Sequence, residues 1–138
     1  MKLLRSTLIN NAPADSQLHA HSDWEISATL QGTSISEIEG KDYTIGKGDV
    51  VVIPPGVYHI RKSTEDFSYV NVGVENVENL HLCILRDADT NISSLFKMIA
   101  AEYVKQQAGY NLICNRLFEC ALEYNAAPKL LPQFLFYL

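Results

Sequence analysis

The first part of the sequence alternates between apolar and polar side chains with a period of two. This alternation is clearest from Trp24 to Gln31, and shorter alternating or β-branched runs follow it. Glycines and the sequence Pro54-Pro55-Gly56 separate the runs. Such a pattern predicts short β-strands joined by close turns. We predict strands over residues 24–31, 34–39, 42–45, 50–53 and 67–74, arranged as an antiparallel sandwich or barrel.

Near residue 88 the pattern changes to helical spacing. One apolar stripe is formed by Ile92, Leu95, Phe96, Ile99 and Tyr103. Asp89, Thr90 or Asn91 can cap this first helix, and a second helix is predicted from about Tyr110 to Asn125. The predicted fold class is therefore mainly β, with a barrel over residues 1–88. Two C-terminal α-helices within residues 89–138 pack on it in the same domain.

The second predicted helix carries apolar side chains on two neighbouring lines. The first line is Ile113, Leu117, Cys120 and Tyr124, and the second is Cys114, Phe118 and Ala121. Because this face is wider than one core contact needs, it predicts a homodimer formed through the C-terminal helices, with a simple core helix as the alternative. The sequence also ends on the apolar run Phe134 to Leu138, which indicates a piece of a longer protein.

Composition narrows the possible classes of protein. With 138 residues, of which 47% are hydrophobic and 20% charged, the chain is one ordinary globular domain. Its 11 Lys and Arg against 16 Asp and Glu give a net charge of -5, which argues against nucleic-acid binding by this chain alone. We find no signal peptide and no long apolar run, so we expect a cytoplasmic protein without membrane contact.

The three cysteines do not form a recognisable pairing pattern. Cys83, Cys114 and Cys120 are odd in number, lack C-x-x-C spacing and lie in apolar runs. We therefore expect three buried thiols rather than disulfides or a zinc ribbon.

Histidine and carboxylate side chains are grouped in a way that suits a metal ion. His19 and His21 are two residues apart and share a strand face, Glu25 can rejoin that face, and His59 follows downstream. Three imidazoles and one carboxylate suit zinc, iron, manganese, nickel or copper and leave coordination positions open. Calcium would require more oxygen ligands.

A polar row continues from this cluster along the same strand face. Glu25, Ser27, Thr29 and Gln31 alternate with Trp24, Ile26, Ala28 and Leu30. If Glu25 points inward, the barrel holds something polar and the helices or another subunit cover the apolar face. The candidate ligand contacts are Ser27, Thr29, Arg61, Tyr69 and Asn71. Taken singly, each is equally explained as an ordinary polar surface residue.

The spacing of these residues resembles the two sequence motifs of the cupin family. The pattern H-x-H, three residues, E, six residues, G is formed by His19, His21, Glu25 and Gly32. The pattern G, five residues, P-x-G, two residues, H is formed by Gly48, Pro54, Gly56 and His59. Pro13 and Ser63 stand where the family has Gly and Asn, at positions that supply no metal ligand. The resemblance implies a jelly-roll β-barrel.

The order of motifs and helices over residues 15–125 is similar to the N-terminal half of AraC-type transcription regulators. That resemblance implies a domain that binds a small polar effector, such as a sugar or polyol, and pairs subunits through its helices. The DNA-binding half of such a regulator would lie outside this sequence, and DNA would be a partner only of the full-length protein. The alternative is a metal-dependent cupin enzyme of the dioxygenase or isomerase type, with His19, His21, Glu25 and His59 as ligands.

Overall fold

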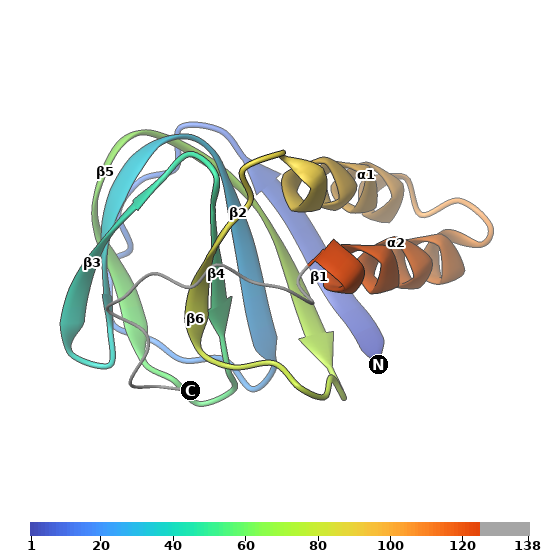
Figure 1. The fold of residues 1–138 in the computed structure, drawn as a ribbon, viewed down its shortest axis with the longest axis horizontal. Coiled ribbons are helices and arrows are strands. Elements are labelled where there is room, and N and C mark those ends of the chain that lie inside the picture. The colour runs from blue at the N-terminus through green and yellow to red at the C-terminus, as the bar shows by residue number, and fades with distance from the viewer. Residues whose placement is uncertain (125–138) are drawn as a thin grey trace.

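The structure, a computed structural model, describes residues 1–124. A curved antiparallel sheet forms one layer and two helices pack side by side against one of its faces (Figure 1). The strands are β1 (Lys2–Ile9), β2 (Trp24–Ile38), β3 (Lys41–Gly46), β4 (Asp49–Ile53), β5 (His59–Glu75) and β6 (Cys83–Arg86). The helices are α1 (Asn91–Lys105) and α2 (Tyr110–Tyr124). The prediction of a mainly β fold followed by two helices is confirmed.

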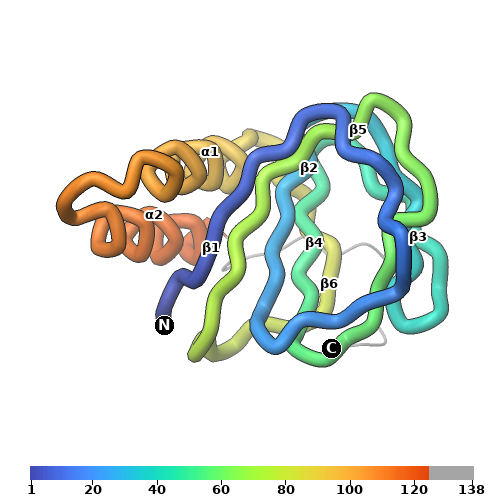
Figure 2. Tube along the Cα trace, turned by 180° about the vertical axis from the view of Figure 1, so that it is seen from behind, coloured from blue at the N-terminus to red at the C-terminus, as the bar shows by residue number. Residues whose placement is uncertain are grey.

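The sheet is open, whereas the sequence led us to expect a closed barrel. Its hydrogen-bonded order is β1-β5-β2-β4-β6, and β3 pairs with the far half of β2. Over residues 1–124 no ladder joins the two ends of this order. β3 and β4 pair with different parts of one edge of β2, and β5 lies along its other edge (Figure 2).

The two longest strands run together and bend along their length. The register of β2 against β5 shifts on either side of Gln31, as expected of β-bulges, and Gly32 has a φ of 74°. We predicted two strands separated at Gly32, but the bulges bend β2 without interrupting it. The sequence pattern also missed β1, β6 and the first half of β5.

The main hydrophobic core lies between the sheet and the helices. Ile26 and Ala28 of β2 belong to this core together with Phe96 of α1 and Phe118 of α2. The rings of Phe96 and Phe118 stack with their centroids 6.3 Å apart. The expectation that the helices cover the apolar face of β2 is therefore confirmed, and the polar residues that alternate with Ile26 and Ala28 face the other way.

The cap of α1 differs from the sequence-based expectation. Asp87, not Asp89, Thr90 or Asn91, accepts hydrogen bonds from the first N–H groups of the helix. Its carboxylate oxygens lie 3.0 Å from the nitrogen of Ile92 and 2.9 Å from that of Ser93. The backbone of Thr90 is in the left-handed conformation, with a φ of 59°, and its side chain makes no capping hydrogen bond. The chain makes a turn before the helix, and this turn places a more distant carboxylate at its N-terminus.

The two apolar lines of α2 have different environments. Cys114, Phe118 and Ala121 are buried, whereas Ile113 and Tyr124 of the other line are exposed. Cys120 lies on that exposed line, so the expectation of a buried thiol was wrong for this cysteine and confirmed for Cys83 and Cys114. Neither helix in the described part is long and apolar enough to cross a bilayer. Asn125 and the apolar run 134–138 lie outside the described residues.

Candidate metal centre and ligand cavity

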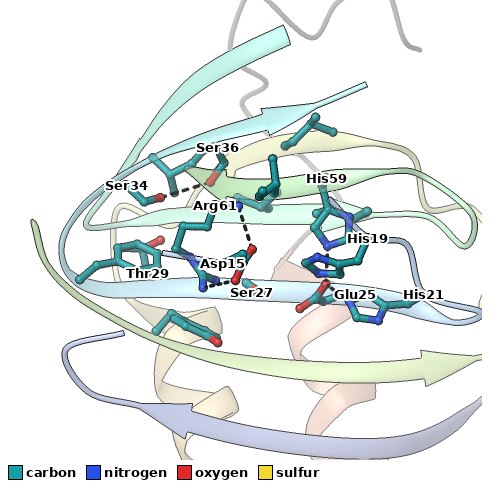
Figure 3. A pocket seen from close by; sticks show the side chains of 17 residues that line it. Asp15, His19, His21, Glu25, Ser27, Thr29, Ser34, Ser36, His59 and Arg61 are labelled. Atoms are coloured by element: carbon teal, nitrogen blue, oxygen red, sulfur yellow. Dashed lines mark hydrogen bonds and ion pairs between the residues drawn. The ribbon is translucent and has the colours of Figure 1, made fainter. Parts of the chain in front are cut away.

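The face of the sheet opposite the helices encloses a cavity of about 240 Å³. Strands β2, β4 and β5 and the segment before β2 supply most of its walls. Histidines lie together on one side of it, and hydroxyl groups lie on the other side (Figure 3). Its polar and charged lining residues are Asp15, His19, His21, Glu25, Ser27, Thr29, Ser34, Ser36, His59, Arg61 and Tyr69.

Backbone pairing brings the histidines together. His19 and His59 form an isolated antiparallel bridge, with N···O distances of 3.0 and 2.8 Å, so the segment before β2 is fixed against the start of β5. The rings of His19 and His59 are 4.4 Å apart between centroids, and that of His21 is 5.0 and 5.2 Å from them. One ring nitrogen from each of the three lies within 4.8 Å of the others, so the three histidines could hold one metal ion.

Hydrogen bonds to the backbone orient two of the three rings. Nδ1 of His19 lies 3.1 Å from the carbonyl oxygen of Gln17, and Nδ1 of His59 lies 2.9 Å from that of Val57. A carbonyl oxygen only accepts, so in both rings the Nδ1–H donates. Such second-sphere bonds fix the tautomer and leave Nε2 as the nitrogen that can bind a metal.

Glu25 supplies the negative charge of the cluster. Its Oε2 lies 3.0 Å from Nε2 of His21 and 3.1 Å from Nε2 of His59. Burial opposes ionisation of Glu25, but the two imidazoles outweigh it and hold the pKa of this carboxyl well below its usual range. In turn, the contact with Glu25 raises the pKa of His21 above its ordinary value. The carboxylate is therefore ionised at neutral pH.

The chemistry of the donors fits a divalent transition metal. Nε2 of His21 is buried, and although it is near Glu25 it has no hydrogen-bond partner within residues 1–124. A buried nitrogen that has an ion-pair contact but no hydrogen bond is stabilised further by binding a metal ion. Imidazole nitrogens with one carboxylate suit zinc, iron, manganese or nickel. An ion that takes five or six ligands would have room for a further ligand beside these four residues, whereas a tetrahedral ion would have none.

Four of the five candidate ligand contacts line the cavity, namely Ser27, Thr29, Arg61 and Tyr69. Asn71 does not, because its side chain is taken up by the neighbouring edge strand: its Oδ1 accepts a hydrogen bond from the Thr7 N–H at 3.1 Å. Gln31 also leaves the polar row. It is exposed, because the bulges around it break the alternation of β2.

The sequence pattern missed Asp15, which contacts Arg61 inside the cavity. Asp15 precedes β2 in a segment without regular structure, so no periodicity marked it. Its pairing with Arg61 joins residues 46 positions apart and depends on the fold alone. His81, to which we assigned no role, is exposed and outside the cluster.

Comparison with known proteins places part of the chain in a family. Residues 8–73 match the family model described as the Cupin domain. A cupin protein from Bacteroides fragilis is 19% identical, with a TM-score of 0.44, over 54% of this chain and 68% of that chain. A protein of unknown function from Streptococcus pyogenes is 20% identical, with a TM-score of 0.48, over 56% of this chain and 68% of that one.

Oxalate decarboxylase of Bacillus subtilis, which has Mn(II) centres, is 22% identical with a TM-score of 0.44. That match covers 56% of this chain but only 22% of the decarboxylase. No curated protein matches the sequence. The family match covers both halves of the histidine and glutamate cluster, and the fold brings these halves together on one face of the sheet. Residues 8–73 therefore form a domain of the cupin superfamily.

Proposed function

We propose that this cupin domain binds a divalent metal ion through His19, His21, Glu25 and His59. In the proposal, the adjoining cavity takes up a small polar effector, as in the sensing domain of an AraC-type regulator. The observation that carries the proposal is the convergence of the three imidazoles and Glu25 on the wall of a cavity of about 240 Å³. A bound metal would supply a Lewis-acidic point that anchors an oxygen atom of the effector.

The other cavity residues act on the effector itself. The hydroxyl groups of Ser27, Thr29, Ser34 and Ser36 can donate and accept hydrogen bonds, as binding of a polar molecule requires. The rings of Phe67 and Tyr69 provide apolar faces beside them. A few placed polar groups on a partly apolar wall are typical of small-molecule sites.

Two features favour sensing over catalysis. Asp15 is paired with Arg61 and Glu25 with two histidines, so neither carboxylate of the cavity stands free as a general base. In addition, Ser27 and Thr29 of the cavity alternate on β2 with Ile26 and Ala28, which pack in the core with the helices. An effector that binds one arrangement of β2 more tightly would thereby change how the helices pack.

We also propose that the helices pair two copies of the chain. Ile113 and Tyr124 of α2 are 42% and 55% exposed, and Leu112 is 60% exposed, so the helix presents apolar surface that the sheet does not cover. Burying such a surface in an isologous contact between two copies would remove it from water. This pairing would give the sensor a second surface through which effector binding is transmitted.

The second candidate function is that of a metal-dependent cupin enzyme. It is favoured by the completeness of the donor set, because a divalent ion held by these four residues could polarise a substrate oxygen. The two functions differ in outcome: a sensor releases its ligand unchanged, whereas an enzyme converts it. Product analysis after incubation of the metal-loaded protein with each binding compound separates them.

Titration calorimetry with Zn²⁺ tests the proposed site. We expect one equivalent to bind to the wild type, and His59→Ala to weaken binding by about tenfold or more because it removes one ligand and one partner of Glu25. His81→Ala is the matched control, since His81 is exposed and outside the cluster. Equal affinity of His59→Ala and the wild type, or no binding by either, would contradict the proposal.

A further inference from the structure

Arg61 places a cation inside the cavity on a rigid support. Its guanidinium carbon lies 4.5 Å from the ring centre of Tyr69 and 5.1 Å from that of Phe67, and its side chain is only 17% exposed. Two aromatic faces hold the guanidinium plane through cation–π contact. Figure 3 shows Arg61 and Asp15 between the hydroxyl groups and the histidine cluster.

The hydrogen-bonding capacity of this guanidinium is largely unused. Asp15 accepts a hydrogen bond from the backbone N–H of Arg61 at 2.8 Å through Oδ2, and from Nη1 at only 3.3 Å through Oδ1. Within residues 1–124, Nε and Nη2 of Arg61 donate no hydrogen bond. The charged group therefore keeps donors that can bind a second carboxylate in the two-pronged geometry that arginine favours.

The charges around the cavity also point to an anion. A divalent ion on the histidines and the guanidinium of Arg61 would together carry three positive charges. The carboxylates of Asp15 and Glu25 supply two negative charges, so one positive charge would remain without a counterion. A neutral sugar would leave this charge uncompensated in a partly desolvated site, whereas a monocarboxylate would neutralise it. Beyond Arg61, the hydroxyls of Thr29, Ser34 and Ser36 line the same wall and suit a hydroxylated molecule.

We infer that the cavity selects small hydroxylated carboxylates, the chemical class of sugar acids, over the neutral polyols of the same carbon skeleton. Arg61 binds the carboxylate, and the serine and threonine hydroxyls bind the hydroxyl groups. This inference rests on the proposed function, because it names the class of effector that the metal-bearing cavity takes. It assigns Arg61 the role of the residue that decides between acid and neutral ligands.

Matched pairs of ligands test the inference on the Zn²⁺-loaded protein. The pairs are D-gluconate and sorbitol, threonate and threitol, and glycerate and glycerol, with affinity measured by thermal shift and calorimetry. We expect at least one acid to bind at least about tenfold more tightly than its polyol, because a hydrogen-bonded ion pair is added. Arg61→Gln should abolish this preference.

The controls separate the role of Arg61 from folding and from overall charge. Lys62→Gln removes the same charge one residue away, where Lys62 pairs with Asp42 on the surface, and should retain the acid preference. Two bonds that use the backbone of Arg61 hold Asp15, so Arg61→Gln leaves this segment attached. If that variant nevertheless fails to fold, Arg61→Lys keeps the charge without the two-pronged geometry and should bind the acid more weakly than the wild type.

Several results would overturn the inference. They are polyols binding as tightly as their acids, no acid binding at all, or an acid preference that persists in Arg61→Gln, which would assign the carboxylate to the metal. The Zn²⁺ isotherm of the wild type keeps the proposed function separate. Normal Zn²⁺ binding without an acid preference contradicts this inference alone, whereas absence of Zn²⁺ binding contradicts the proposed function and the charge argument built on it.

Discussion

Gly32 occupies a backbone position that other residues fit poorly. Its φ is 74°, and a Cβ atom there would overlap the backbone carbonyl of Asp66 on β5. Gly32→Ala must therefore adopt a left-handed conformation and also push β2 away from β5 at their bend. We expect it to lower the free energy of unfolding by about 3 kcal/mol or more, measured by urea denaturation.

Gly40→Ala separates the two costs. Gly40 also has a positive φ, of 79°, but no atom lies within 4 Å of the Cβ that alanine would add. This control should lose only about 1–2 kcal/mol, the penalty of the left-handed conformation. If the two variants are equally stable, close approach of β5 is not the reason for glycine at position 32.

At the same scale, the sequence predicted the donors of the site better than their surroundings. The predicted donors do lie together, but the reason differs from the predicted shared strand face. His19 forms an isolated bridge with His59 and His21 lies in no strand, whereas Glu25 and His59 lie in β2 and β5. Asp15 could not be predicted, because its contact with Arg61 exists only after β5 and the segment before β2 have come together. Gln31 was misplaced for a related reason, since a bulge reverses the alternation and no local pattern marks it.

The start of α1 depends on a buried carboxylate upstream of the helix. Asp87 is 7% exposed and accepts hydrogen bonds from the N–H groups of Ile92 and Ser93. Asp87→Ala leaves both donors without their partner, and we expect a loss of about 1–2 kcal/mol in chemical denaturation. Asp89→Ala removes an exposed carboxylate nearby and should change stability by less than about 0.5 kcal/mol. A reversed order of the two variants would show that Asp87 does not cap α1.

At the scale of elements, the segments with a regular apolar period could be predicted from the sequence, whereas the strands at the edges of the sheet could not. Both helices and the strand that carries Ile26 and Ala28 followed from spacing, because one face of each packs in the main core. The short strand β6 depends on its partner β4, and β1 depends on β5, so their sequences alone gave no strand signal. The prediction of a closed barrel was wrong for the same reason, because closure depends on pairing between segments that are far apart in the sequence.

For the whole molecule, pairing of two copies through the helices is a prediction that is tested at exposed positions of α2. Phe118 is 1% exposed and packs in the core, so a charge there would unfold the protein rather than report on an interface. Leu112→Glu combined with Ile113→Glu instead places charges on the exposed side of α2. We expect sedimentation to show a dimer for the wild type and a monomer for this double variant.

The control adds the same charge away from the apolar line. Gln107→Glu combined with Asn111→Glu changes two exposed polar residues and should leave the dimer intact. A monomeric wild type, or a double variant of Leu112 and Ile113 that still sediments as a dimer, would argue against pairing through α2.

The measurement that tests the central claim most directly is anomalous diffraction from crystals soaked with Zn²⁺. The account predicts one strong peak at the cavity wall, about 2.0–2.2 Å from Nε2 of His19, His21 and His59 and from a carboxylate oxygen of Glu25. A ligand atom from water or the effector beside these four would show that the ion is five-coordinate and can anchor the effector. A cavity without a peak, or a peak bound only at the exposed His81, would contradict the account.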